Sequence, residues 1–373
     1  LVDCDMFYVQ VARLEDPEGA GRDDLLIVGG SPAGRGVVTS ASYAVREFGV
    51  HSGMPTAQAL RLCPEARVVP VSRKACSRRS REVEAVLKEL SPVVQAASID
   101  EFYLDLSGTE RMLHPESLAD TSVRIQREVL RRTAISVSVG GGTRKLVAKL
   151  AAGRAKPGGT LVVPPGEEAS FMRAFDLRDL PGIGPALTRA LEARGLVAVE
   201  DLLAVEMEWL ERWFGPRRAR WLWERVRGRD PAPGNPSVPR KSISSEKTFS
   251  SDLVDDRTLE GELLMLVTSV GAPLRRKNLQ GRTITVKIRD KDFQTRQASH
   301  SLPDPIVSDA AIYSVARQLF RELRARRRTG VRLLGVGISS LAPGEGPPQL
   351  DLFHEGVGIE PERDRTISRL MDD

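Results

Sequence analysis

The sequence predicts an α+β protein built from several domains. Its 373 residues are more than one hydrophobic core usually holds. Up to about residue 163, β-rich runs mix with helical runs such as Cys76 to Leu90 and Leu118 to Arg132, as in other α+β domains. Four prolines in the segment from Asp230 to Pro239 then indicate an extended linker, which separates two independently folding units.

Two groups of carboxylates lie in β-rich runs of the first part of the chain. The opening residues alternate apolar and acidic side chains, so Asp3 and Asp5 would project from the same face of a strand. A second apolar run, Val94 to Leu106, is interrupted by the adjacent pair Asp100 and Glu101. If Asp3, Asp100 and Glu101 converge, their repulsion requires a cation, and their oxygen ligands favour Mg²⁺. Two such ions could activate a hydroxyl nucleophile and stabilise a leaving oxygen. The alternative is that these acids lie at strand ends in solvent.

Three further residues suit a phosphate group. Tyr43 and Arg46 would share one face of a helix that stops at Gly49, so that a hydroxyl and a guanidinium could meet the same phosphate. Lys156 ends a helical run that starts at Thr143, and a lysine there could neutralise the charge of a triphosphate. Taken alone, each of these residues would more often be a solvated surface residue.

Four motifs together resemble one protein family. In chain order they are Asp3-Cys4-Asp5-Met6-Phe7-Tyr8, Tyr43-Ala44-Val45-Arg46 with Ser52-Gly53-Met54-Pro55 after it, Ser98-Ile99-Asp100-Glu101, and Ala155-Lys156-Pro157. Their order and approximate spacing resemble those of the Y-family DNA polymerases in the bacterial DinB (DNA polymerase IV) branch. The similarity extends from residue 1 to about residue 342. A chance match to all four motifs is far less expected than a match to one.

The resemblance implies a right-hand polymerase with a ferredoxin-like palm, small fingers, a helical thumb with a helix-hairpin-helix motif, and an α/β little-finger domain. The boundaries that it implies are 1–5 and 72–163 for the palm, 6–71 for the fingers, 164–229 for the thumb, 230–242 for the linker, 243–342 for the little finger and 343–373 for a tail. In the little finger, periodicity indicates strands at Thr283 to Ile288 and Leu333 to Ile338, and helices at Leu259 to Lys277 and Ala310 to Arg327.

By this resemblance, three carboxylates form the catalytic site. Asp3, Asp100 and Glu101 match the family's metal-binding and catalytic carboxylates, and the backbone carbonyl of Cys4 matches an additional metal ligand. The implied cofactor is a pair of Mg²⁺ ions, for which Mn²⁺ could substitute. Asp5 is expected to support the site and not to be a primary metal ligand.

The resemblance also assigns residues to the incoming nucleotide. Tyr8 falls on the family's steric-gate position, where an aromatic ring leaves no room for a 2′-hydroxyl and so selects deoxynucleotides. Tyr43 and Arg46 are implied to contact the triphosphate, with Ser40 assisting and Lys156 adding positive charge. The alternative for Tyr8 and the phenylalanine before it is ordinary core packing.

Two regions are expected to bind the DNA backbone without reading its sequence. In the thumb, a turn around Gly182 and Gly184 resembles a helix-hairpin-helix, whose free N–H groups hold a phosphate; the alternative is a tight turn between helices. In the little finger, Arg282, Lys287 and Arg289 would lie on or near the polar face of a strand and follow phosphates. The alternative there is a solvated sheet face. Basic residues gather around this strand and after it: Arg275, Arg276, Lys277, Lys291, Arg296, Arg324, Arg326, Arg327 and Arg328.

The tail carries a segment that resembles the peptide by which bacterial polymerases bind the sliding clamp. In it, Leu352 and Phe353 could fill an apolar clamp pocket while Gln349 makes polar contacts and Leu350 adds a further contact. About twenty residues follow this segment, whereas in this branch the peptide often ends the chain. The alternative is that it docks on its own domain.

Composition agrees with these expectations. A formal net charge of +5 and a pI near 9.2 permit a polyanionic partner without requiring one. Three cysteines without metal spacing or a disulfide pattern fit a reducing cytosol. No apolar run reaches membrane-spanning length and no signal-peptide pattern opens the chain, so we expect a soluble, cytoplasmic protein. Because the chain begins at Leu1 and not at Met, we also expect residues upstream and a shortened first strand.

The function expected from the resemblance is template-directed DNA synthesis of the translesion type. Such an enzyme would act as a monomer on primer-template DNA and dNTP, with low fidelity and distributive synthesis, in DNA damage tolerance. Small residues are frequent around Val37 to Gly53 of the expected fingers, which would relax selection over the templating base. One alternative is a catalytically silent adaptor of the same fold. Another is a DNA repair module that uses its helix-hairpin-helix for strand cleavage.

Overall fold

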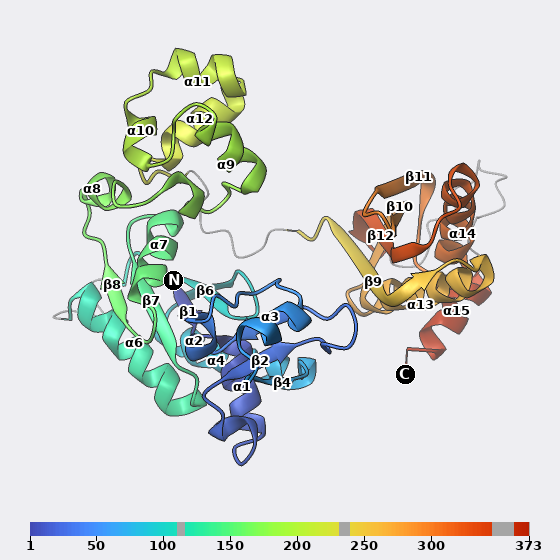
Figure 1. Ribbon diagram of the computed structural model, residues 1–373, viewed down its shortest axis with the longest axis horizontal. Helices are drawn as coiled ribbons and strands as arrows, with labels where there is room; N and C mark the ends of the chain where they lie inside the picture. Colours follow the sequence, from blue (N-terminus) through green and yellow to red (C-terminus); the bar gives the residue numbers. More distant parts are fainter. Residues whose placement is uncertain (110–115, 231–238, 345–361, 373) are drawn as a thin grey trace. The chain divides into compact units, whose positions relative to one another are not determined.

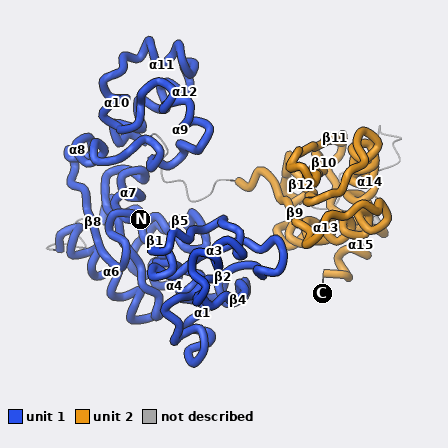
Figure 2. Tube along the Cα trace, in the orientation of Figure 1, with its two compact units in different colours: residues 1–237 blue, residues 238–373 orange. Residues whose placement is uncertain are grey.

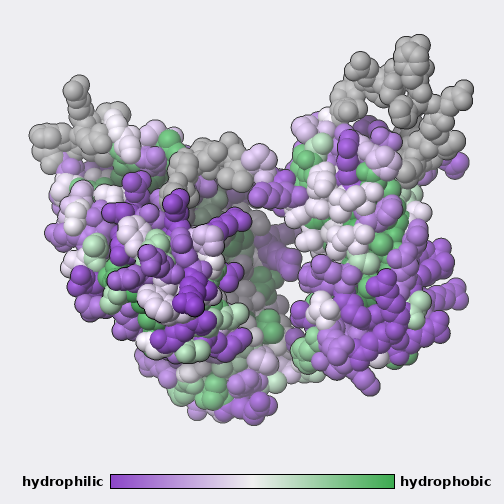
Figure 3. Space-filling view, turned by 90° about the horizontal axis from the view of Figure 1, so that it is seen from above, coloured by the Kyte–Doolittle hydropathy of each residue, from purple (hydrophilic) through white to green (hydrophobic). Residues whose placement is uncertain are grey.

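The computed structural model describes residues 1–109, 116–230, 239–344 and 362–372. The chain divides into two compact units, residues 1–237 and residues 238–373, which Figure 2 colours separately. Hydrophilic residues cover most of the visible surface of each unit, and hydrophobic residues form small separate patches (Figure 3). Within the described residues, no helix is both long and apolar enough to cross a membrane.

A five-stranded sheet forms the centre of the first unit (Figure 1). Its strand order is β5-β6-β1-β7-β8, in which only β7 and β8 are parallel neighbours. The strands are β1 (Val2–Cys4), β5 (Val93–Ala96), β6 (Glu101–Asp105), β7 (Val137–Gly141) and β8 (Thr160–Val162). The two strands that carry the predicted catalytic carboxylates, β1 and β6, are therefore neighbours near the middle of the sheet.

Two helices cover one face of this sheet. They are α4 (Arg73–Leu90) and α6 (Leu118–Thr133), and both were predicted from their periodicity. Val2, Cys4 and Phe102 point to this face and are almost fully buried there. The apolar residues of β1 therefore build the core, so that strand alternation turns its acidic residue to the other side.

A third helix, α7 (Lys145–Ala155), packs against the opposite face of the sheet. Gly140 of β7 allows this close packing, because a Cβ atom there would lie 2.1 Å from the carbonyl oxygen of Ala148. Ala148 packs with Leu1, and alternation along β1 places Asp3 on the same side as Leu1. The acidic side of β1 therefore faces α7.

The remaining parts of the first unit form two smaller assemblies. A three-stranded sheet of order β3-β2-β4 contains β2 (Leu26–Gly29), β3 (Val38–Ala41) and β4 (Arg67–Val69), with helices α1 (Phe7–Glu15), η1 (Ala20–Arg22), α2 (Tyr43–Arg46) and α3 (Thr56–Leu62). After β8 the chain is helical, with α8 (Glu168–Met172), η2 (Leu177–Asp179), α9 (Pro185–Glu192), α10 (Val199–Leu203), α11 (Met207–Phe214) and α12 (Pro216–Arg225). Trp213, Trp221 and Trp223 pack against the core of these helices, whereas Trp209 is half exposed.

The second unit is a four-stranded antiparallel sheet covered by two helices on one face. Its strand order is β11-β10-β12-β9. The elements are β9 (Ser242–Leu253), α13 (Asp256–Arg276), β10 (Leu279–Asp290), β11 (Thr295–Ile306), α14 (Asp309–Arg326), β12 (Val331–Pro343) and α15 (Glu362–Leu370). The predicted positions of β10, β12, α13 and α14 are confirmed, while β9 and β11 were not predicted.

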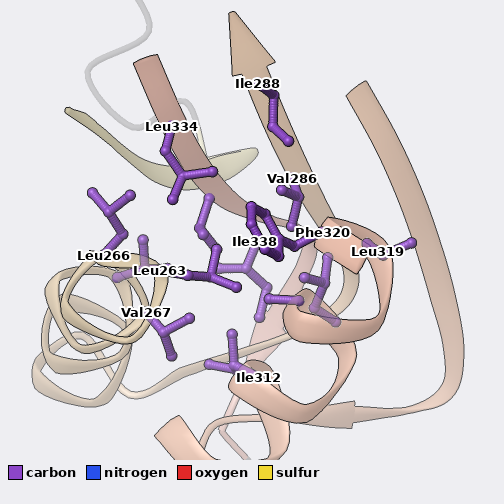
Figure 4. Close-up of a cluster of buried hydrophobic side chains, with 14 of the residues drawn as sticks. Leu263, Leu266, Val267, Val286, Ile288, Ile312, Leu319, Phe320, Leu334 and Ile338 are labelled. Carbon is purple, nitrogen blue, oxygen red and sulfur yellow. The ribbon is translucent and has the colours of Figure 1, made fainter. Parts of the chain in front are cut away.

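The core of the second unit lies between this sheet and α13 and α14. Figure 4 shows Leu263 of α13 and Phe320 of α14 close to Val286 and Ile338 of the sheet, and all four are fully buried. The predicted inward positions along β10 are confirmed, because Ile284, Val286 and Ile288 have no exposed surface. The opposite face of β10 is left to polar residues.

Candidate functional site

The three predicted catalytic carboxylates come together at the ends of β1 and β6. Asp3 and Glu101 are direct cross-strand partners, a position in which side chains lie close together on one face. Asp100 occupies the bend before β6, and its carbonyl oxygen accepts a hydrogen bond from the backbone N–H of Cys4 at 2.9 Å. The bend therefore places the adjacent acids Asp100 and Glu101 in the same region as Asp3, although nearly a hundred residues separate them in sequence.

Two lysines of the α7 region neutralise this acidic cluster. The Nζ atom of Lys156 lies 2.6 Å from Oδ1 of Asp3, and Nζ of Lys149 lies 2.7 Å from both carboxylate oxygens of Glu101. Burial raises the pKa of Asp3, the hydrogen bond from Lys156 lowers it, and the charges of Glu101 and Asp100 raise it further. Holding three carboxylates together in this partly buried place therefore requires positive charge.

The donor set of this cluster suits a hard divalent cation. Asp3, Asp100 and Glu101 offer carboxylate oxygens, and the thiol of Cys4 is buried, so that its backbone carbonyl is the group that could add a further oxygen ligand. In the part of the chain that the structure describes, no three His, Cys, Asp or Glu side chains already form a metal-holding group. The carboxylates of Asp3 and Glu101 instead pair with lysines, which a bound cation would have to displace.

Lys149 is a member of this site that sequence reasoning missed. It precedes Lys156 by seven residues, which is two helical turns, so both lysines lie on the same side of α7. That spacing was the available signal. In the sequence it reads as an ordinary lysine on a solvated helix face, and only the packing of α7 on the sheet reveals its partner.

The two aromatic residues at the start of α1 have different surroundings: Phe7 lies in the core, and Tyr8 lies near the carboxylates. Phe7 is 2% exposed and belongs to the core below the five-stranded sheet, so the core-packing interpretation holds for it. Tyr8 is partly exposed and meets Phe7 edge to face with ring centroids 5.7 Å apart. Burial raises the pKa of Tyr8, and the charge of Asp100 adds to this shift. Tyr8 therefore lies between the core and the carboxylates.

The predicted phosphate ligands of the fingers share a short helix. In α2, the Arg46 guanidinium stacks over the ring of Tyr43 at 4.8 Å, and its Nε donates to the carbonyl of Ala41 at 2.9 Å. Burial, followed by the charge of Asp5, raises the pKa of Tyr43 to about 12, so its hydroxyl remains a donor at neutral pH. Ser40 lies on the adjacent strand β3 and is buried.

Asp5 lies just beyond the end of β1. The strand ends at Cys4, and Met6 takes a left-handed backbone conformation with φ 35°, which turns the chain into α1. Asp5 nevertheless stays on the Asp3 side, because it accepts a hydrogen bond at 2.7 Å from Ser138, the cross-strand partner of Asp3. Asp3 and Asp5 therefore lie on the same side, as expected, although β1 ends before Asp5.

The predicted thumb glycines lie at the turn before α9. Gly182 has φ 94°, and a Cβ atom there would lie 2.8 Å from the ring of Trp221. Both observations exclude larger residues at this position. Gly184 is the N-cap residue of α9, and a Cβ atom there would meet nothing within 4 Å. Packing thus explains Gly182, whereas Gly184 stands at an open helix end.

The outer face of the second unit's sheet is polar and has only shallow relief. Thr283 and Thr285 of β10 each share a hydrogen bond of 2.9 Å with a serine of β11, Ser301 and Ser299. Further along β10, Lys287 forms an ion pair with Glu246 of β9. A shallow depression on this face is lined by these two residues together with serines, Thr285 and the glycines of β12.

The other two predicted little-finger residues lie on the same strand. Arg289 donates from Nε to the hydroxyl of Thr295 at 2.9 Å. Arg282 is exposed at an irregularity in the pairing of β10 with β11. This irregularity explains its exposure, since strict alternation from Ile284 would have turned Arg282 inward.

Several other basic residues of this unit are structural. Arg275 is buried and pairs with Asp309 and Asp372, and Arg324 is buried and pairs with Asp256. Arg296 and Arg327 both pair with Asp290, which has no exposed surface. Only part of the basic set noted in the sequence is therefore available at the surface for a partner. The predicted clamp-binding residues Gln349, Leu350, Leu352 and Phe353 lie outside the described residues.

Comparison with protein families gives three matches along the chain. Residues 2–153 match the impB/mucB/samB family, and residues 240–352 match the C-terminal domain of that family. Between them, residues 178–230 match a family described as "DNA polymerase-iota, thumb domain". The matches cover the sheet with the carboxylates, the helical segment and the second unit.

Curated relatives and solved structures agree with these matches. DNA polymerase IV of Halorhodospira halophila is 37% identical over 352 residues, which cover 94% of this chain and 97% of that protein. DNA polymerase IV of Staphylococcus saprophyticus is 35% identical over 340 residues, which cover 91% of this chain and 94% of that protein. A "Y-family DNA polymerase chimera Dbh-Dpo4(243-245)-Dbh" superposes with a TM-score of 0.80 at 27% identity, covering 92% of this chain and 98% of that one. DinB from Sulfolobus solfataricus superposes with a TM-score of 0.60 at 28% identity, covering 91% and 97%.

These matches confirm the resemblance on which the sequence expectations rested, together with the right-hand polymerase fold of palm, fingers, thumb and little finger. The chain therefore belongs to the impB/mucB/samB family and, within the Y-family DNA polymerases, to the DNA polymerase IV branch.

Proposed function

We propose that this chain, a DNA-directed DNA polymerase of the translesion type like its relatives, extends a primer 3′-hydroxyl at the acidic cluster of β1 and β6. The observation that carries the proposal is the meeting of Asp3, Asp100 and Glu101 beside Tyr8. A silent adaptor of the same fold would have no need of three carboxylates held together against their own repulsion. No feature of the described residues favours strand cleavage.

Asp3, Asp100, Glu101 and the carbonyl of Cys4 would hold two Mg²⁺ ions, with Mn²⁺ as a substitute. Such ions make the 3′-hydroxyl a better nucleophile and stabilise the charge on the leaving pyrophosphate. Until then Lys149 and Lys156 offset the repulsion between the carboxylates, because each lysine places a positive charge beside one of the acids. A cation bound by Asp3 would free Lys156 to contact the triphosphate.

Tyr43, Arg46 and Lys156 would bind the triphosphate, and Ser40 would support them from β3. Arg46 is held over the Tyr43 ring, so the two donors are presented together. Tyr8 would lie against the sugar of the incoming nucleotide and exclude a 2′-hydroxyl. The ring is fixed for this role because Phe7 packs against it from the core.

Primer-template DNA would be held by its backbone at two surfaces. In the thumb, the turn at Gly182 and Gly184 would offer N–H groups to a phosphate. In the little finger, Arg282, Lys287 and Arg289 would contact further phosphates, with no preference for sequence. The solved relatives include an "Insertion ternary complex of Dbh DNA polymerase", which supports DNA and nucleotide as the joint ligands.

The proposed domain boundaries follow these roles. We assign residues 1–5 and 72–163 to the palm, 6–71 to the fingers, 164–229 to the thumb, 230–242 to the linker, 243–342 to the little finger and 343–373 to a tail. The small fingers would leave the templating base loosely held, which would give low fidelity. We further propose that the enzyme is a monomer and works in the cytoplasm, where a bacterium keeps its DNA.

Primer extension tests the catalytic proposal. Purified protein is given an undamaged primer-template, each dNTP in turn and Mg²⁺, and the same reaction is repeated with EDTA. We expect extension by the templated nucleotide, and none with EDTA. Failure to extend a primer that is demonstrably bound would contradict the proposal and favour the silent adaptor.

The clamp proposal needs a separate experiment. Replacing Leu352 and Phe353 with Ala should leave distributive extension unchanged and remove stimulation by the bacterial sliding clamp, because the two apolar anchors are lost. Stimulation that persists in this variant would place the clamp contact elsewhere on the chain.

A further inference from the structure

The carboxylate of Asp5 is the most heavily hydrogen-bonded acid near the proposed active site. It is 2% exposed, and each of its two oxygens accepts two hydrogen bonds. Oδ1 accepts from the hydroxyl of Ser138 at 2.7 Å and from that of Tyr43 at 3.3 Å. Oδ2 accepts from the hydroxyl of Ser136 at 2.9 Å and from the backbone N–H of Gly158 at 2.9 Å.

These four donors leave Asp5 little capacity to bind a metal. A carboxylate offers about four acceptor positions, and all four are in use. A cation at Asp5 would have to break contacts that hold β7 and the turn after α7. A cation at Asp3, by contrast, would have to displace only the flexible side chain of Lys156. Asp5 therefore has a different task from Asp3 although the two acids are separated by a single residue.

Two of the four donors belong to segments that carry proposed triphosphate ligands. Tyr43 is itself one of these ligands and comes from α2 of the fingers. Gly158 follows Lys156 by two residues, and its N–H also lies 3.0 Å from the hydroxyl of Ser138. The carbonyl of Gly158 accepts from Gln126 of α6 at 2.6 Å, so this residue is held from both sides. Asp5 thus joins the fingers and the α7 turn to the end of β1.

We propose that Asp5 is a positioning residue for the triphosphate, which acts through Tyr43 and through the turn that carries Lys156. This inference rests on the proposed function of those two residues. The hydrogen bond from Tyr43 holds the ring in place before the nucleotide arrives. Because this bond is long and therefore weak, the hydroxyl can easily turn from Asp5 to a phosphate oxygen. The bond from Gly158 has the ordinary length of 2.9 Å and holds the turn after α7 to Asp5. Together they fix the two ligands before binding, which lowers the entropic cost of binding the nucleotide.

Two substitutions of Asp5 separate these contacts. In Asp5→Asn, the amide oxygen must face the N–H of Gly158, because that group can only donate, and the NH₂ group then faces the hydroxyls of Ser138 and Tyr43. The turn is kept and Tyr43 loses its acceptor. In Asp5→Ala, both contacts are lost. Steady-state extension at saturating primer-template measures KM for the templated dNTP and kcat for each variant.

We expect the KM for dNTP to rise about threefold in Asp5→Asn and about tenfold or more in Asp5→Ala, with smaller changes in kcat. Primer-template Kd should stay within about twofold of wild type in both, since Asp5 contacts no DNA-binding residue. Ser122→Ala is the matched control, because it removes another buried hydroxyl of the palm, bonded to Leu118, away from the site. It should leave the KM unchanged even if it lowers Tm.

A double-mutant cycle with Tyr43→Phe gives the decisive readout. If Asp5 acts through Tyr43, the threefold effect of Asp5→Asn disappears in the Tyr43→Phe background. An unchanged KM in Asp5→Asn, or an effect that simply adds to that of Tyr43→Phe, would overturn the proposal. So would a parallel loss of Tm, kcat and DNA binding, since that pattern indicates a purely structural role. Wild-type extension in the same assay keeps this outcome distinct from a failure of the proposed function.

Discussion

The carboxylate cluster of the first unit and the outer sheet face of the second unit use charge in opposite ways. At the cluster, three acids lie close together and two of them have a specific cationic partner: Asp3 pairs with Lys156, and Glu101 pairs with Lys149. On the sheet face, hydroxyls, glycines and scattered basic residues spread over four exposed strands. We propose catalysis at one point in the first region and DNA binding spread over an area in the second.

This difference has an energetic consequence. Charges in a desolvated site interact strongly, so loss of one member leaves its partners uncompensated. Exposed charges on a sheet face are screened by water and salt, and each contributes little by itself. Single substitutions should therefore be drastic in the cluster and mild on the face. The following predictions test that order.

The largest effect is expected for Asp3→Asn. This change keeps the shape of the side chain and removes the charge that pairs with Lys156 and that we propose holds a metal ion, so extension should fall about a thousandfold. Primer-template Kd, measured by fluorescence anisotropy, should remain within about twofold because the DNA surfaces are untouched. A fall of only a few-fold in extension would place Asp3 with the mild group and break the comparison.

Tyr8→Ala should change selectivity and not abolish activity. Removal of the ring opens the space for a 2′-hydroxyl, so the ratio of ribonucleotide to deoxynucleotide incorporation should rise about tenfold or more. Competitive incorporation of a matched rNTP and dNTP measures this ratio. Phe7→Ala is not a suitable control because Phe7 is a core residue, whereas Tyr8→Phe keeps the ring and should leave the ratio unchanged. An unchanged ratio in Tyr8→Ala would remove the gate assignment.

How much could be foreseen from the sequence depended on the range of the interactions. Local periodicity was enough for the inward row of β10 and for the shared helix of Tyr43 and Arg46. It was not enough for Lys149, whose partner lies on a strand 48 residues away. It also misled for Arg275, which looks like a surface base in sequence but is buried between two aspartates.

The role of Asp5 was foreseen only in outline. The family resemblance suggested a supporting carboxylate, but the four donors to Asp5 come from α2, from β7 and the residue before it, and from the turn after α7. Such a convergence depends on tertiary packing and has no signature in a local pattern. The family resemblance supplied the proposed metal ligands and the proposed gate, whereas the supporting contacts could be seen only in the fold.

On the sheet face, Lys287→Ala combined with Arg289→Ala should weaken primer-template binding several-fold at moderate salt. Each lost phosphate contact should lower the slope of log Kd against log salt by about 1. Anisotropy titrations at four salt concentrations measure this slope, and kcat at saturating DNA should be unchanged. Arg296→Ala is a poor comparison because it removes one of the two arginines that pair with the buried Asp290. Thr283→Ala offers an uncharged change on the same strand, away from Lys287 and Arg289. An unchanged slope would remove both residues from the DNA interface.

The smallest effect is expected for Glu246→Gln. This carboxylate pairs with Lys287 on the face that we propose meets DNA, so it competes with phosphate for the lysine. Both side chains are about one-third exposed, and removing the charge should tighten primer-template binding by about two- to fivefold. Glu262→Gln, which releases Lys247 beside α13, is the matched control and should have no effect. Weaker binding in Glu246→Gln would show that the pair supports the face and does not mask it.

The most direct test of the account compares wild type with the Asp100→Ala, Glu101→Ala double variant in two assays on the same samples: single-nucleotide primer extension with Mg²⁺ and primer-template binding. We expect extension by wild type alone and equal DNA binding by both proteins. Extension by the double variant at a rate near that of wild type would contradict the central claim that the acidic cluster of β1 and β6 is the catalytic centre.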